Sequence, residues 1–251
     1  MKSAVSRAVV AVSVVAALGA SAACSAGGDD DGKKSAKPGA SGGAAAKLEK
    51  AALATGDVKG YKIEKPEAAE AEGADRPTGK PSPAECAPLA AVLDVGAPSK
   101  PKARAGRVVT PTSDEDVTTT RVELSAFAEA DAKKAMADLS AATKSKKCAD
   151  FRVGDQRYFG VEALPAPDKG DEAISYKVAQ RKGEYVTRES ATVVRSGSTL
   201  VAFDASNLYD PEGVQRDKEA AKDGMDGTGT PTADEDPKVA PALVDAQLAK
   251  L

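Results

Sequence analysis

Apolar side chains recur at helical spacing between residues 129 and 146, and this segment is the clearest helix that the chain predicts. Acidic residues stand near its start and lysines near its end, as the helix dipole favours. Cys148 follows directly after it. The predicted apolar stripe lies at positions i, i+3, i+4, i+7 and i+10 and consists of Ala132, Ala135, Met136, Leu139 and Ala142.

Alternation of apolar and polar residues predicts several strands. In residues 117–127, Val122, Leu124 and Ala126 alternate with polar neighbours, which is typical of a half-buried strand. We expect further strands at residues 61–63, 106–111, 158–164, 173–181, 185–194 and 199–203. Glycine-containing runs at 181–184 and 195–198 predict tight turns, so the last three strands form an antiparallel meander. The predicted class is therefore α+β, with a meander-rich antiparallel sheet flanked by helices in a single domain.

Three shorter helices accompany this sheet. One begins near Ala46 and stops near Gly56, and a second is predicted to start at residues 82–85, with Ser82 as its cap. Pro88 conflicts with the interior of that second helix, so we expect a kink or a tight first turn there. The third occupies residues 237–251 and is predicted to dock on the sheet through Leu243, Val244, Leu248 and Leu251.

The remaining segments are polar or rich in glycine and proline. We expect mobile loops at 65–82 and 95–104 inside a folded domain that spans 46–209. Residues 24–45 are Gly, Ser, Ala and charged residues, which predicts a flexible tether. Residues 210–236 are predicted to be a second polar mobile segment.

Residues 1–23 have the layout of a secretory signal peptide. Lys2 and Arg7 precede or border an apolar run, residues 8–18, which is too short to span a bilayer. Small residues then lead to Cys24, and this setting resembles the lipobox of bacterial lipoproteins. The resemblance implies diacylation of Cys24 and a lipid anchor on the extracytoplasmic face of the cell membrane, where two acyl chains anchor stably. Ordinary signal-peptidase cleavage after 21–23 is the alternative.

The amino-acid composition limits the catalytic and metal-binding sites that the chain can form. The chain contains no histidine and no tryptophan, so catalytic units that need histidine and metal sites ligated by histidine are excluded. Removal of residues 1–23 leaves 33 basic against 38 acidic residues, a net charge of −5, which makes nucleic acid an improbable partner. No cofactor or metal is expected. If Cys24 is acylated, Cys86 and Cys148 remain as one pair, and an exported protein favours a disulfide between them.

Several short motifs resemble the folded part of actinobacterial cell-envelope lipoproteins of unassigned role, and through it the extracellular sensor domain of mycobacterial PknH-type Ser/Thr kinases. They are Gly60-Tyr61, Glu85-Cys86-Ala87-Pro88-Leu89, Cys148, Gly170-Asp171-Glu172-Ala173 and Arg195-Ser196-Gly197. The resemblance implies an antiparallel sheet with flanking helices and a cleft for an unidentified ligand. Those sensor domains typically carry two disulfides, whereas this chain can form one.

Three functions remain open. The first is a lipid-anchored, non-catalytic binding or sensor-like module, which would show an apolar pocket between the sheet and the 129–146 helix. Tyr61, Tyr158, Tyr176 and Tyr185 are the aromatic side chains to inspect there, although each is expected to pack in the core. The alternative is a structural or protein-interaction component of the envelope, with an exposed apolar patch instead.

An enzyme is the third reading and is not expected. Asp171 and Glu172 are candidate carboxylates, but neighbours on a strand point to opposite faces. Partners would then be the bilayer, through Cys24, and an unknown small molecule, lipid or envelope protein. The ligand-binding residues are unknown at this stage.

Overall fold

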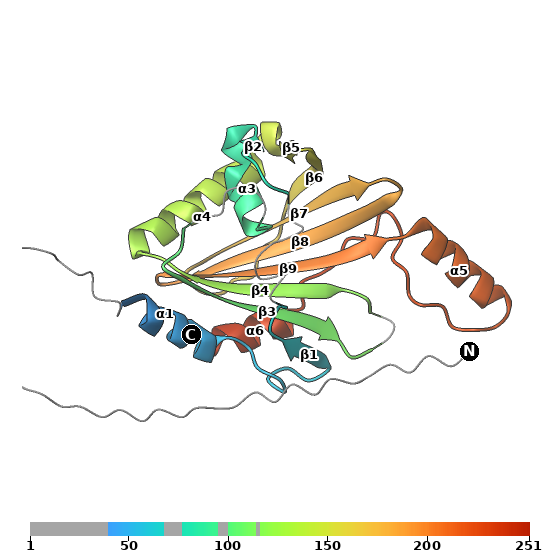
Figure 1. Ribbon diagram of the computed structural model, residues 1–251, viewed down its shortest axis with the longest axis horizontal. Coiled ribbons are helices and arrows are strands. Elements are labelled where there is room, and N and C mark those ends of the chain that lie inside the picture. The colour runs from blue at the N-terminus through green and yellow to red at the C-terminus, as the bar shows by residue number, and fades with distance from the viewer. Residues whose placement is uncertain (1–39, 68–76, 95–99, 114–115) are drawn as a thin grey trace, which may run out of the picture. The chain divides into compact units, whose positions relative to one another are not determined.

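Nine antiparallel strands form one sheet in the order β1-β3-β4-β9-β8-β7-β6-β5-β2 (Figure 1). The computed structural model describes residues 40–67, 77–94, 100–113 and 116–251. The strands are β1 (Tyr61–Glu64), β2 (Pro81–Ser82), β3 (Ala103–Pro111), β4 (Thr119–Ala126), β5 (Asp150–Val153), β6 (Gln156–Leu164), β7 (Glu172–Lys182), β8 (Tyr185–Ser196) and β9 (Thr199–Tyr209). The predicted meander is confirmed, and it extends back through β6 and β5.

Five α-helices and two short 3₁₀ turns are present in the described residues. The helices are α1 (Ala40–Ala51), α3 (Ala87–Val92), α4 (Glu129–Lys144), α5 (Pro211–Lys222) and α6 (Pro241–Leu248), and the turns are η1 (Ala84–Cys86) and η2 (Lys146–Cys148). With the antiparallel sheet, they confirm the α+β class. No helix in this part of the chain is both long enough and apolar enough to span a bilayer.

The helices cover both faces of the sheet. Helices α3 and α4 pack in one core and α1 and α6 in the other, and the two pairs appear toward the top and the bottom of Figure 1. We call the two faces of the sheet the α4 face and the α6 face. Side chains alternate along each strand, so Val193 of β8 packs in the core of the α4 face and Val194 packs in the core of the α6 face. Both cores are apolar, and each is closed by the stripe of a helix.

The helix predicted from residue 82 begins later and differently. Ser82 belongs to β2, so its predicted role as a helix cap is wrong. A single 3₁₀ turn, η1, precedes α3, and Pro88 lies in the first turn of α3. Proline is tolerated there because the first backbone N–H groups of a helix have no intrahelical acceptor. The expectation of a tight first turn is therefore confirmed.

Residues 210–236 are not the mobile polar segment that the sequence predicts, because residues 211–222 form α5. Asp210 caps this helix by accepting a hydrogen bond from the backbone N–H of Glu212, at 3.0 Å. The segment that follows α5 is held against the helix by Asp217. The carboxylate of Asp217 accepts hydrogen bonds from the backbone N–H groups of Thr228 and Thr230, both at 2.7 Å. These hydrogen bonds lower the pKa of Asp217 well below its usual range. This helix and the turn after it are therefore stabilised mainly by hydrogen bonds to Asp210 and Asp217, because few of their side chains are buried.

Other boundaries differ by smaller amounts. Helix α1 begins at Ala40, inside the predicted tether 24–45, and residues 24–39 lie outside the described residues. The predicted loops 65–82 and 95–104 are shorter, because Pro81 starts β2 and Ala103 starts β3. Their central parts, 68–76 and 95–99, are not described.

The C-terminal helix docks on the α6 face as predicted. Leu243 and Val244 are buried there, but Leu251 is 45% exposed, so its predicted docking is wrong. The amide of Gln247 is also buried. It accepts from the Leu53 backbone N–H at 3.0 Å and donates to the Ala51 carbonyl at 2.7 Å. This side chain therefore joins α6 to the end of α1.

Candidate functional site

A groove of about 270 Å³ lies between α3, α4 and the α4 face of the sheet, where the sequence analysis expects an apolar pocket. Its walls come from the two helices and its floor from β4, β8 and β9. The apolar lining consists of Ala87, Pro88, Ala91, Val92, Phe127, Ala135, Met136, Leu139, Val193, Leu200 and Ala202. This volume is slightly below that of drug-sized pockets, so the groove suits a small ligand or one end of a longer one.

Small residues on the facing helices create the space. Met136 and Leu139 of the predicted stripe are buried against the sheet, whereas Ala135 of the same helix is only half-buried and lines the groove. Ala87 and Ala91 line it from α3. Because alanine has only a Cβ, the two helices can cover the sheet without filling the gap between them.

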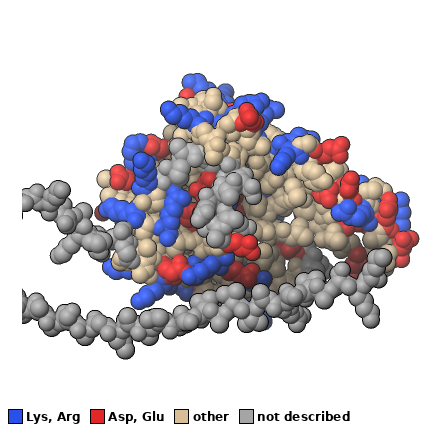
Figure 2. All heavy atoms as spheres, in the orientation of Figure 1, with Lys and Arg blue, Asp and Glu red and all other residues tan. Residues whose placement is uncertain are grey.

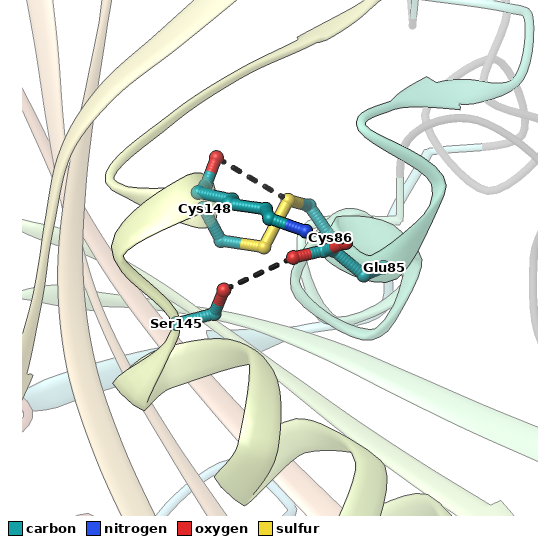
Figure 3. Close-up of a disulfide and its surroundings, with 5 residues drawn as sticks. Glu85, Cys86, Ser145 and Cys148 are labelled. Carbon is teal, nitrogen blue, oxygen red and sulfur yellow. Dashed lines mark hydrogen bonds and ion pairs between the residues drawn. A yellow bond between two sulfur atoms is a disulfide. The ribbon is translucent and has the colours of Figure 1, made fainter.

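A disulfide ties the two walls together. Cys86 lies at the start of α3 and Cys148 lies just after α4, and their sulfur atoms are 2.08 Å apart. The predicted pairing is confirmed. Figure 3 shows Glu85 and Ser145 pointing toward one another beside this bond, and the Ser145 hydroxyl lies 3.2 Å from the Glu85 carboxylate. Both ends of the bond are buried, so α3 cannot move far from the end of α4.

The polar groups at the edge of the groove already have protein partners. The Ser125 hydroxyl donates to Glu123 Oε1 at 2.9 Å, and Arg104 Nη1 lies 3.4 Å from the same oxygen. On α4, Asp138 pairs with Lys134 at 2.5 Å. A ligand would therefore gain mainly from burial of apolar surface, with Glu123 and Ser125 as secondary hydrogen-bonding groups.

None of the four predicted tyrosines lines the groove. Tyr158 and Tyr176 are fully buried in the core of the α4 face, as expected of core side chains, whereas Tyr61 is half-buried and Tyr185 is 44% exposed. The aromatic side chain that does line it is Phe127, which the sequence analysis did not single out. Its place directly after a predicted strand and before the predicted helix is the signal that could have found it.

A buried charged cluster lies on the α4 face outside the groove lining. Arg121 Nη2 lies 2.6 Å from Asp204 Oδ2, and Gln180 Nε2 donates to Glu189 Oε1 at 3.1 Å. Glu189 Oε2 is buried and has no hydrogen-bond partner in the described residues. Burial and then the neighbouring charge of Asp204 raise the pKa of Glu189 to about 8, although Arg121 opposes both effects.

Asp171 has a structural role, and Glu172 Oε2 lies 3.7 Å from Arg195 Nε. Asp171 Oδ2 accepts from Arg195 Nη1 at 2.7 Å and from the Gly197 backbone N–H at 2.8 Å, which holds the β8–β9 turn. Gly170 precedes them with φ +65°, and a Cβ there would lie 2.5 Å from the Arg195 carbonyl oxygen. The motifs 170–173 and 195–197 are thus parts of one corner of the fold.

No group of three or more Asp, Glu or Cys side chains in the described ranges is arranged to hold a metal ion. The predicted lipidation site, Cys24, lies outside these ranges. The groove is therefore an apolar recess between linked walls, and the polar groups at its edge are already paired.

Comparison with known proteins does not assign a family. No family model and no curated protein matches the chain. Among solved structures, it is similar to an uncharacterized protein from Mycobacterium smegmatis, the Rv0999 ortholog, with 12% identity and a TM-score of 0.37 over 77% of this chain and 90% of that chain. A likeness of this size supports no inference about the site.

Proposed function

We propose that this protein is a non-catalytic binding protein that holds a small apolar ligand in the groove between α3, α4 and the sheet. The groove itself carries the proposal: its lining is mostly apolar and its walls are linked by the Cys86–Cys148 disulfide. Fixed walls favour binding because less conformational entropy is lost when the ligand enters. If the protein acts as a sensor, a partner protein would distinguish the form with a ligand in the groove from the form without one, in line with the resemblance to PknH-type sensor domains.

We also propose that the protein acts outside the cytoplasm, anchored to the membrane through acylated Cys24. A structural disulfide supports this location, because such bonds persist in oxidising compartments. Once Cys86 and Cys148 are paired, Cys24 is the one cysteine left for acylation. A purely structural or interaction role is the alternative. It needs a broad apolar patch, and the large exposed apolar side chains among the described residues are Val117, Tyr185, Leu208, Met225 and Leu251.

Filling the groove tests the binding proposal. Ala135→Phe places a ring into the space between α4 and α3, and Ala137→Phe places the same ring on the solvent side of α4 as a matched control. With 1-N-phenylnaphthylamine as a neutral apolar probe, we expect fluorescence enhancement with the wild type and with A137F. A135F should bind at least tenfold more weakly while melting cooperatively. Equal binding by A135F and the wild type would show that the groove is not the site.

The location is tested separately. Cys24→Ala should release the protein from membranes or leave residues 1–23 uncleaved, because no thiol remains for acylation. Membrane fractionation followed by mass measurement of the intact protein provides the readout. Retention of a normally processed C24A protein in the membrane would rule out the anchor.

A further inference from the structure

A second cavity, of about 370 Å³, lies on the opposite side of the sheet, on the α6 face. Its floor is formed by β7 and β8. One wall is the segment 164–169, which joins β6 to β7, and the other is the segment 237–245, which leads into α6. None of its lining residues lines the groove on the α4 face.

Three buried hydroxyl groups form the floor of this second cavity. Ser175 of β7 and Thr192 of β8 are registered opposite one another, and their hydroxyl oxygens are 2.8 Å apart, so they satisfy each other. Ser190 lies two residues before Thr192 on the same face, is 4% exposed and lines the cavity. Its Oγ has no hydrogen-bond partner among the residues that the structure describes.

An unpartnered buried hydroxyl is uncommon, because buried polar groups in folded proteins are nearly always hydrogen-bonded. The neighbours of Ser190 on this face are polar, with Lys177 opposite it on β7 and Arg188 and Thr192 on either side of it along β8, but none of them is hydrogen-bonded to its Oγ. A serine at this place therefore points to a polar atom that approaches from the cavity. Either a water molecule or a polar group of a ligand could form this hydrogen bond. The chemistry of the other cavity walls helps to distinguish these two possibilities.

The walls of the cavity are apolar and stiff. Pro165, Pro167, Pro237 and Pro241 line it together with Leu164 and Val239. The segment that carries Pro237 is held by Asp236, which accepts from Lys177 at 3.0 Å and from Arg188 at 2.9 Å. Burial raises the pKa of Asp236, but these hydrogen bonds outweigh it and keep the pKa below its usual value. The recess is thus built before any ligand arrives.

The rim carries a net positive charge. Lys169 pairs with Asp245 at 2.8 Å, so these two charges compensate each other. Lys238 also lines the cavity and is exposed, with no ion pair to the described residues. A ligand that fits this charge carries an anionic group at the rim.

We propose that this second cavity binds a small organic carboxylate that bears a hydroxyl group. The hydroxyl hydrogen-bonds with Ser190 Oγ, the hydrocarbon body lies between the proline walls, and the carboxylate pairs with Lys238. The proposal is independent of the function proposed for the groove, because the two sites share no residue.

The proposal is tested by measuring the affinities of three matched probe molecules for the full chain by ligand-observed NMR. 4-Hydroxybenzoate carries both polar groups, benzoate lacks the hydroxyl and phenol lacks the carboxylate. We expect 4-hydroxybenzoate to bind most tightly. Ser190→Ala should weaken it roughly fivefold to tenfold without affecting benzoate, since one hydrogen bond is lost. Lys238→Gln should weaken both carboxylates several-fold and leave phenol unchanged. Lys218→Gln, exposed on α5, is the control for the loss of one lysine.

Several outcomes overturn the proposal. One is that no probe binds at millimolar concentration. A second is that 4-hydroxybenzoate binds equally to the wild type, S190A and K238Q. A third is a crystal grown with 4-hydroxybenzoate in which Ser190 Oγ contacts only water. A135F, the variant that fills the groove, should bind 4-hydroxybenzoate as the wild type does, so failure at one site is distinguishable from failure at the other.

Discussion

On the α4 face, two helices joined by a disulfide border an apolar groove whose polar neighbours are already paired. On the α6 face, strands β7 and β8 present hydroxyl groups to a cavity walled by proline-rich connecting segments. The α4 face therefore relies on a covalent bond and helix packing to keep its recess open. The α6 face relies on stiff backbone and on ion pairs to Asp236. One sheet thus supports two recesses of different chemistry.

The contrast between the two faces is visible at two consecutive residues of strand β8, Glu189 and Ser190. Glu189 points to the α4 face and Ser190 to the α6 face, because neighbours on a strand point to opposite sides. Both side chains are buried, and each has one oxygen without a hydrogen-bond partner in the described residues. On one face the consequence is a carboxyl group with a raised pKa, and on the other it is a hydroxyl group that faces a cavity.

Removal of the disulfide should have the largest effect and should separate the two faces. Replacing Cys86 and Cys148 by Ala together opens a loop with a sequence separation of 62 residues. Chain entropy alone then lowers the free energy of unfolding by about 4 kcal/mol, measured by urea denaturation. Affinity of the groove for 1-N-phenylnaphthylamine should fall, and affinity of the second cavity for 4-hydroxybenzoate should not. Loss of both affinities in the folded variant would mean that the faces are not independent.

A pH-dependent effect on stability is expected from Glu189→Gln. The folded-state pKa of about 8 lies above the ordinary value of 4.5, so between these values the folded protein keeps a proton that the unfolded chain releases. The contribution of Glu189 to stability therefore declines as pH rises through this window and stays low above it. E189Q lacks this decline, so its free energy of unfolding should match that of the wild type near pH 4.5 and exceed it by a growing margin as the pH rises to about 8.

Urea denaturation between pH 5 and 9 provides this measurement, and Glu184→Gln, exposed in the turn before β8, provides the control. The groups that face Glu189 are Asp204, Arg121 and Gln180, and they are unchanged in both variants. A constant difference between E189Q and the wild type across this range would mean that Glu189 titrates as an ordinary carboxylate.

The smallest expected effects distinguish the hydroxyl groups of the α6 face. Ser175→Ala removes the partner of Thr192 and should lower the free energy of unfolding by roughly 1 kcal/mol. Ser190→Ala removes a hydroxyl that has no partner in the described residues, so stability should remain equal or rise slightly. Thermal unfolding of the two variants side by side checks this order. A larger loss in S190A than in S175A would show that Ser190 is bonded inside the protein.

Much of this fold could be predicted from local patterns. The spacing of Met136 and Leu139 predicted α4, and glycines at the turns predicted the hairpins, where Gly183 and Gly197 have φ +63° and +59°. Strand β2 was missed because two residues are too few to show alternation. Strand β5 was overlooked although Phe151 and Val153 alternate with polar residues in it. Helix α5 was missed because Val214, Ala220 and Ala221 are too few apolar residues to form a clear stripe, and only Asp210 and Pro211 mark its start.

The sites were less predictable because their residues meet through tertiary structure. The place of the groove, between sheet and helix, followed from the stripe on α4, but the alanines of α3 that border it have no signal of their own. Arg121 and Asp204 are 83 residues apart, and their pairing depends on β4 lying beside β9. Ser175 and Thr192, in contrast, belong to one hairpin, so their approach could have been inferred from its register.

Native mass spectrometry of the protein purified from its own host tests the central claim most directly. We predict that the wild type, with its disulfide intact, carries a bound mass that is absent from A135F and present on A137F, because only A135F fills the groove. A wild-type protein with no bound mass, or the same mass on A135F, would contradict a ligand-binding groove on the α4 face.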